Sequence, residues 1–95
     1  MNKETILKKL EENKDRLKKQ KVKKIGLFGS YLKGSNKKNS DIDFLVNTGA
    51  ISLSDYINIL RLLETLFKKN IDLVIEEDLK PELEYIRQEV EYAKI

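Results

Sequence analysis

The sequence predicts a small α/β layer fold, in which helices flank a mixed three-stranded sheet. Short apolar stretches of strand length alternate with longer stretches whose apolar residues recur at helical spacing. Loop residues separate these stretches in the order helix, strand, helical turn, strand, helix, strand, helix. The chain has 95 residues, which is the size of one small domain. We therefore expect residues 1–95 to form a single domain.

The first half of the chain supplies a helix, two strands and a short turn between them. Apolar residues Ile6, Leu7, Leu10 and Leu17 fall in one arc of a helical wheel, so residues 5–20 are expected to form an amphipathic helix. Residues 22–28 end in the apolar run Ile-Gly-Leu-Phe, which is typical of a strand buried on both faces. Residues 30–33 predict one helical turn that ends at Gly34. A polar loop then leads to a second strand over residues 41–46.

The second half supplies a long helix, a third strand and a final helix. Ser52 or Ser54 can cap the long helix, which is expected to extend to about Lys69. Its apolar residues cover more than half of the wheel, so the sheet should cover one side of it and another helix a second side. Residues 71–75 predict the third strand, and Pro81 suits the first turn of a last helix over residues 81–95.

Two groups of residues in that last helix should lie on different faces. Leu83, Ile86 and Val90 share the face expected to pack on the sheet. Tyr85 and Tyr92 are seven residues apart and lie together on another face, which is either a docking surface for a partner or a pair of half-exposed rings lying over their own helix.

The composition excludes several kinds of chemistry. The chain has no histidine and no cysteine, so Ser–His and Cys–His catalysis are excluded and a metal site must use oxygen ligands. No apolar run is long enough to span a membrane, and the first residues are not of signal-peptide type. We therefore expect a cytoplasmic protein with no membrane partner.

Lysines cluster between residues 18 and 24, and the net charge of the chain is +3. Such a cluster either attracts the phosphates of a nucleotide or nucleic acid, or is a solvated surface that aids solubility. No aromatic residues are interleaved with these lysines to stack on bases, which disfavours a nucleic-acid partner.

Three polar features interrupt the predicted strands and converge on one edge of the sheet. Gly29-Ser30 follows the first strand and opens a helical turn, where backbone amides can bind an anion. Asp41 and Asp43 are alternate residues of the second strand, so their carboxylates project to the same side and repel each other unless a cation lies between them. Asp72 lies one residue into the third strand. Each feature alone is common in plain turns and strand ends, but together they indicate a metal-dependent phosphoryl-transfer site.

These residues resemble a known signature. Gly29-Ser30, ten intervening residues and then Asp41-Ile42-Asp43 match the Gly-Ser-x10-Asp-x-Asp motif of the minimal nucleotidyltransferases, a group within the DNA polymerase beta-like nucleotidyltransferase superfamily. The apolar residues around the motif and the block Ile71-Asp72-Leu73-Val74 look like the same family, and the resemblance covers about residues 22–75.

The resemblance implies a role for each residue of the motif. Asp41 and Asp43 would bind two magnesium ions, with manganese as a substitute, and Asp72 would complete one metal site and help to activate the attacking hydroxyl. Gly29 and Ser30 would hold the β- and γ-phosphates of ATP. The nucleotide-binding set also includes Ser40, which precedes the acid pair, and Lys33, which stands where many family members have arginine.

The resemblance also implies a biological role. Minimal nucleotidyltransferases of this type are commonly antitoxins of MntA type, which transfer AMP from ATP to a tyrosine of a HEPN-domain toxin. The small size agrees with this expectation, because a chain of 95 residues leaves little room for an acceptor pocket and a partner must supply one. The alternative is a non-catalytic module that neutralises its partner by stoichiometric contact. Whether the chain forms a homo-oligomer or a hetero-oligomer is open at this point.

Overall fold

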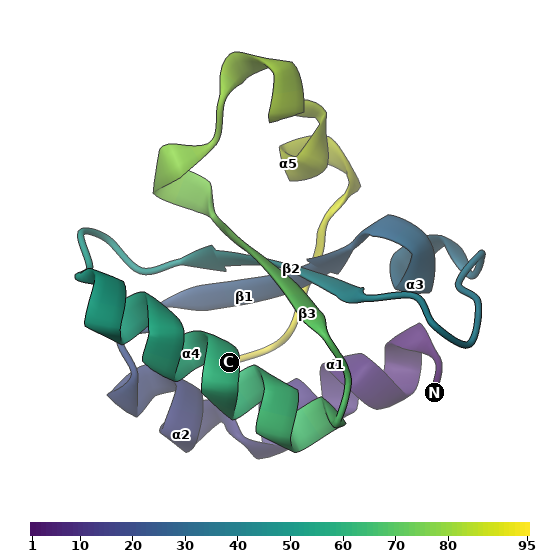
Figure 1. The fold of residues 1–95 in the computed structure, drawn as a ribbon, viewed down its shortest axis with the longest axis horizontal. Coiled ribbons are helices and arrows are strands. Elements are labelled where there is room, and N and C mark those ends of the chain that lie inside the picture. The colour runs from purple at the N-terminus through teal and green to yellow at the C-terminus, as the bar shows by residue number, and fades with distance from the viewer.

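A four-stranded sheet lies between two layers of unequal size in the computed structural model, which describes residues 1–95 (Figure 1). The larger layer contains α1 (Lys3–Glu12), α2 (Lys14–Lys19) and α4 (Leu53–Phe67). The opposite face carries two single-turn 3-10 helices, η1 (Glu76–Asp78) and η2 (Pro81–Leu83), and the short helix α5 (Tyr85–Glu89). None of these helices combines the length and apolar composition needed to cross a membrane.

The sheet is mixed, as the sequence predicts, but it has a fourth strand. Its order is β3 (Ile71–Ile75), β2 (Ile42–Asn47), β1 (Lys24–Phe28) and β4 (Glu91–Tyr92). Strand β2 pairs antiparallel with β1 and parallel with β3. The register places Asp43 opposite Phe28 on one side and opposite Asp72 on the other. The helix α3 (Gly29–Lys33) follows β1 directly and lies at the end of the sheet (Figure 1).

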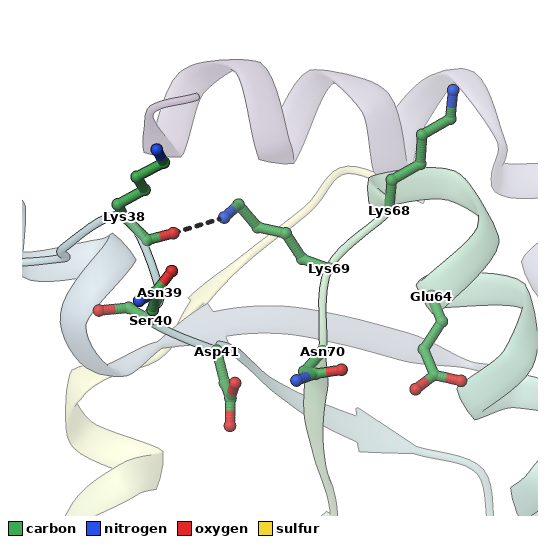
Figure 2. Close-up of a pocket in the computed structure, with 8 residues that line it drawn as sticks. All are labelled: Lys38, Asn39, Ser40, Asp41, Glu64, Lys68, Lys69 and Asn70. Atoms are coloured by element: carbon green, nitrogen blue, oxygen red, sulfur yellow. Dashed lines mark hydrogen bonds between the residues drawn. The ribbon is translucent and has the colours of Figure 1, made fainter.

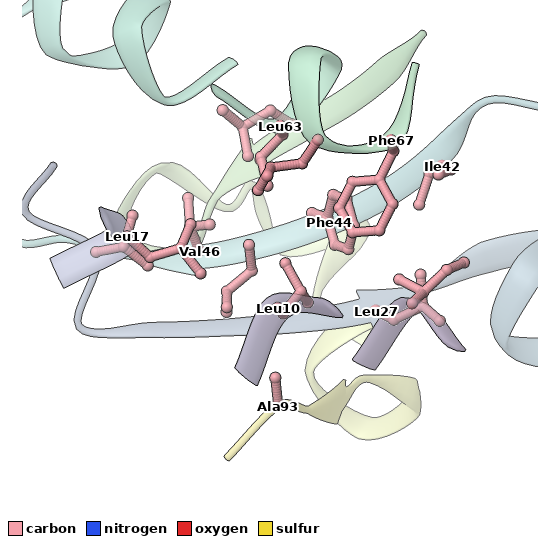
Figure 3. Packing of buried hydrophobic residues seen from close by; sticks show 14 of the residues in the cluster. Leu10, Leu17, Leu27, Ile42, Phe44, Val46, Leu63, Phe67 and Ala93 are labelled. Carbon is pink, nitrogen blue, oxygen red and sulfur yellow. The ribbon is translucent and has the colours of Figure 1, made fainter. Parts of the chain in front are cut away.

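The main core fills the space between the sheet and the larger helical layer. Alternate residues of β2, namely Ile42, Phe44 and Val46, face this core and are fully buried. Figure 3 shows Phe44 against Phe67 of α4, with ring centroids 5.5 Å apart. Residues of α1 and α2 belong to the same cluster, so α4 packs on both the sheet and the other helices, as its wide apolar face predicts.

The opposite face of the sheet has a much smaller apolar cluster. Phe28, Leu45 and Ile86 are its buried members. Leu45 and Asp43 are alternate residues of β2, so the Asp43 side chain lies on this thinly covered face. The sheet therefore presents its acidic residues on the side that α5 leaves mostly open.

Two sequence predictions about helices are wrong. The first helix is divided at Asn13, whose side-chain Nδ2 donates to the carbonyl oxygen of Lys9 at 2.8 Å and so competes with the helical hydrogen bonds. The helix expected over residues 81–95 is reduced to α5, because Val90 adopts an extended conformation. The chain then pairs with β1, and the N–H of Ala93 donates to the carbonyl of Ile25 at 2.9 Å.

Because the last helix ends at Glu89, the two tyrosines are not where the sequence predicts them. Tyr85 is in α5, whereas Tyr92 is in β4 and its hydroxyl donates to Glu76 at 3.3 Å. The two rings therefore do not share a helical face, and the docking surface expected from their spacing does not exist in that form. Of the three residues expected to pack on the sheet, Ile86 is buried, Val90 is half-buried and Leu83 is 36% exposed.

Candidate active site

The sheet topology brings the predicted polar residues to one end of the sheet. Strand β1 ends at Phe28, beside the start of antiparallel β2, so Gly29 and Ser30 lie next to Asp43. Strand β3 runs parallel to β2, and its second residue, Asp72, is level with Asp43. Asp41 is the residue before β2 begins and is exposed. The three polar features that the sequence predicts to converge therefore meet at this end of the sheet.

Gly29 is in direct contact with the carboxylate of Asp43. Its φ is +74°, a left-handed conformation that favours glycine. A side chain at this position would also collide with the Asp43 carboxylate, because an added Cβ would be 2.8 Å from Cγ and closer still to Oδ2. The glycine thus allows the backbone to turn sharply from β1 into α3 and to press against the acid.

The electrostatics of Asp43 depend on three neighbours. Burial, a hydrogen bond with the Asp72 carboxyl, and the negative charges of Asp72 and Asp41 raise the pKa of Asp43 from 3.8 to about 6. The backbone N–H of Ser30 donates to the carboxylate and acts in the opposite direction. Two acids that share a hydrogen bond need a proton or a cation between them, because two neighbouring negative charges repel.

The donor set fits magnesium, although the side chains are not arranged as a finished metal site. Carboxylate oxygens are the ligands that magnesium prefers, and one or two of them from the protein are enough when substrate phosphates and water complete the octahedron. Asp43 and Asp72 form a pair, but no group of three acidic side chains is close enough to hold an ion. Asp41 affects Asp43 through its charge and lies at the same end of β2.

The other two residues of the expected nucleotide-binding set make contacts within the protein. Lys33 forms an ion pair with Glu89 of α5, with 3.5 Å between Nζ and Oε2. Ser40 accepts a hydrogen bond at Oγ from the N–H of Lys37 at 2.8 Å, which closes the loop before β2. Lys33 thus links α3 to the thin layer, and Ser40 shapes the approach to Asp41.

A polar hollow beside Asp41 was not found by sequence reasoning. It has a volume of about 560 Å3 and no apolar residue in its lining. Figure 2 shows that it lies between the loop before β2 and the segment that joins α4 to β3. Its lining consists of Lys38, Asn39, Ser40, Asp41, Glu64, Lys68, Lys69 and Asn70. The only hint of it in the sequence is the pair of lysines, Lys68 and Lys69, that lies between the long helix and Asn70, the residue before the third strand.

The sequence is similar to those of known proteins. The sequence model of the nucleotidyltransferase domain family matches residues 6–95. The protein adenylyltransferase MntA of Thermococcus cleftensis is 43% identical over 60 residues, which are 62% of this chain and 61% of that protein. The match thus spans less than two thirds of the relative's length.

Solved structures agree over nearly the whole chain. One assigned as a minimal nucleotidyltransferase has a TM-score of 0.81 and 28% identity, and the match covers 96% of this chain and 95% of that one. A chain of a toxin–antitoxin complex solved with AMP-PNP has a TM-score of 0.71 and 25% identity, covering 99% of this chain and 73% of that one. Since the family match extends from α1 to the last residue and includes the whole acidic end of the sheet, the chain belongs to the nucleotidyltransferase domain family.

Proposed function

We propose that this domain is a magnesium-dependent nucleotidyltransferase that transfers AMP from ATP to a tyrosine of a partner HEPN toxin and thereby silences it. The observation that carries the proposal is the position of Asp43, held between Gly29 and Asp72 with Asp41 two residues away. The similarity to a protein adenylyltransferase, and to a chain solved in a toxin–antitoxin complex with an ATP analogue, supports the choice of reaction and partner.

The proposed reaction assigns one task to each residue. Magnesium held by Asp41, Asp43 and Asp72 would neutralise charge on the triphosphate. Gly29 gives a phosphate room to approach the backbone, and Ser30 can donate to it from its hydroxyl. The tyrosine oxygen attacks the α-phosphorus, the bond to the β-phosphate oxygen breaks, and pyrophosphate leaves. Asp72, which is exposed at the start of β3, accepts the proton of the tyrosine hydroxyl.

The alternative is a module that neutralises its partner by contact alone. Such a module would not need Asp43 and Asp72 to lie opposite each other on adjacent strands, because a surface that only binds a partner does not depend on that pairing. Asp72 instead helps to raise the pKa of Asp43. Carboxyl groups with strongly shifted pKa values cluster at catalytic sites, which favours an enzyme over a module that only binds.

The decisive experiment measures labelled AMP on the HEPN protein after incubation with this chain, magnesium and ATP labelled at the α-phosphate. We expect transfer by the wild type, and none by Asp41→Asn or Asp43→Asn, with both variants folded. Asp15→Asn, which removes an exposed acid of α2, is the matched control and should remain active. If Asp43→Asn still silences the toxin without labelling it, the contact-only module is correct.

A further inference from the structure

An ion pair joins α3, which begins at Gly29 and Ser30, to α5 in the layer that covers the acids. Lys33 is the last residue of α3 and Glu89 is the last residue of α5, with 3.5 Å between Nζ and Oε2. No other salt bridge or hydrogen bond connects these two helices, which Figure 1 shows at the end of the sheet and over its thinly covered face. The pair is therefore the one polar contact between α3 and α5.

The register of the sheet brings Glu89 close to Gly29. Leu27 of β1 is paired with Glu91 of β4 in antiparallel orientation. The same register, continued by two residues, leads to Gly29 on one segment and to Glu89 on the other. Asp43 contacts Gly29 from the β2 side. The turn at Gly29 thus has the acid cluster on its β2 side and the carboxylate of Glu89 on its β4 side.

A carboxylate in this position opposes the binding of a triphosphate, because like charges repel unless a cation lies between them. Lys33 supplies that cation, and it is also close to the turn where the proposed function places the β- and γ-phosphates. It follows Gly29 by four residues, about 6 Å along a helix and on the same face. The lysine stem is flexible, and 58% of the Lys33 side chain is exposed, so the ammonium group can turn from the carboxylate to a phosphate.

An exposed ion pair can also be a plain surface contact that contributes little. The five salt bridges of the chain differ in one respect that bears on this alternative. Only the pair of Lys33 with Glu89 includes a residue of the expected nucleotide-binding set. It is therefore the only salt bridge in which a carboxylate of the protein and a phosphate of the substrate would need the same ammonium group.

We propose that Glu89 makes an autoinhibitory contact: it pairs with Lys33 in the free protein, and the β- and γ-phosphates of a bound triphosphate displace it. The proposal rests on the function proposed above and adds how nucleotide binding is regulated at that site. Displacement breaks the polar contact between α3 and α5, while Arg87 of α5 keeps its pair with Glu76. Nucleotide binding therefore loosens the end of α5 and leaves the rest of the layer in place.

The test is a double-mutant cycle on the binding of magnesium ATP and magnesium tripolyphosphate, measured by calorimetry. Glu89→Gln should tighten the binding of both about twofold to fivefold, which is the range for an exposed ion pair. Lys33→Gln should weaken binding, and the addition of Glu89→Gln to that variant should have no further effect. Glu91→Gln, which removes a carboxylate two residues away that pairs with Lys3, is the matched control and should bind like the wild type. AMP, which lacks the displacing phosphates, should bind equally to wild type and Glu89→Gln.

Hydrogen exchange gives a second measurement that does not depend on affinity. Saturating magnesium tripolyphosphate should speed the exchange of α5 amides in the wild type, because the contact with α3 is lost. It should leave the exchange of these amides unchanged in Glu89→Gln, in which the contact is already absent. Slower exchange of α5 in the wild type on binding would contradict displacement and would show that Glu89 orients Lys33 toward the nucleotide.

The cycle separates the pairing from the general effect of a negative charge. If Glu89→Gln tightens binding equally with and without Lys33, or if Glu91→Gln tightens it as much, the effect is a general one and the autoinhibitory contact does not exist. Transfer of labelled AMP to the HEPN protein is measured separately. If the cycle behaves as expected but no AMP is transferred, the proposed reaction fails and the contact stands. If AMP is transferred but Glu89→Gln leaves ATP binding unchanged, the reaction stands and the contact fails. If no triphosphate binds to any variant, both fail.

Discussion

At the scale of single residues, the site depends on one contact, between Gly29 and Asp43. The glycine is needed for two separate reasons, a left-handed backbone and the absence of a side chain where the carboxylate lies. The sequence indicated the first reason, because glycine after a buried strand is typical of a tight turn. It could not indicate the second, since the antiparallel pairing of β1 with β2 brings the two residues together across 14 positions of sequence.

Replacing Gly29 by alanine should separate these two reasons. We expect Gly29→Ala to lower the free energy of unfolding by about 2–4 kcal/mol, from backbone strain and from collision with Asp43. Gly34→Ala is the matched control, because Gly34 has φ +76° and open space where the Cβ would lie. It should lose only the conformational part, about 1–2 kcal/mol. Equal losses in urea denaturation of the two variants would contradict a tight contact at Gly29.

The raised pKa of Asp43 predicts an unusual dependence of stability on pH. The folded protein binds this proton more tightly than the unfolded chain, since the folded pKa is about 6 and the ordinary value is 3.8. The contribution of Asp43 to stability is therefore fully present below about pH 4 and is lost as pH rises to about 6. Asp43→Asn has no such proton. As the pH rises from about 4 to about 6, the unfolding free energy of the wild type should therefore fall relative to that of Asp43→Asn.

Magnesium provides the control for this pH prediction. A bound cation relieves the repulsion that the proton relieves at low pH, so saturating magnesium with ATP should stabilise the wild type most above pH 6. The measurement is urea denaturation at a series of pH values, with and without magnesium and ATP. A difference between wild type and Asp43→Asn that is constant with pH would show that Asp43 is ordinary.

At the scale of elements, helix and strand boundaries were predictable where local chemistry decides them. Ser52 and Asp55 form a capping box at the start of α4, and the third strand begins and ends where its apolar run does. The last segment was not predictable in this way. Its spacing of Leu83, Ile86 and Val90 is helical, but pairing of Glu91 and Tyr92 with β1 ends the helix at Glu89. Such long-range strand pairing overrides local spacing.

The capping box gives a prediction that belongs to α4. Ser52→Ala should lower the free energy of unfolding by about 1 kcal/mol, because the Asp55 N–H loses its acceptor, Ser52 Oγ, at 3.1 Å. Ser54 is two residues away in the same turn and is exposed, so Ser54→Ala is the matched control and should change stability by at most a few tenths. Thermal denaturation of both variants makes the comparison. Similar losses would mean that the helix start is not fixed at Ser52.

At the scale of the whole molecule, the two faces of the sheet differ in how much apolar surface they bury and in which of them carries the acids. One face buries an 18-residue cluster, and the other holds three buried residues together with the acids. The periodicity of the sequence predicted the first face well, since each strand and helix displays its core residues. The convergence of Asp43 and Asp72 was also predictable from strand parity. The hollow was not, because its two walls come from segments about 30 residues apart that meet only when β2 and β3 pair.

This asymmetry predicts that the thin layer opens independently of the main core. Phe44→Ala should lower the global free energy of unfolding by about 3–5 kcal/mol, because Phe44 is fully buried against Phe67. Phe28→Ala removes the ring that supports Ile86, so its main effect should fall on residues 76–90. Native-state hydrogen exchange distinguishes the two: amides of α5 should exchange faster in Phe28→Ala while amides of α1 and β2 keep most of their protection. Uniform loss of protection in Phe28→Ala would mean that the two faces unfold as one unit. A separately opening layer would let α5 move while the β1–β2–β3 arrangement that holds Gly29, Asp43 and Asp72 together stays intact.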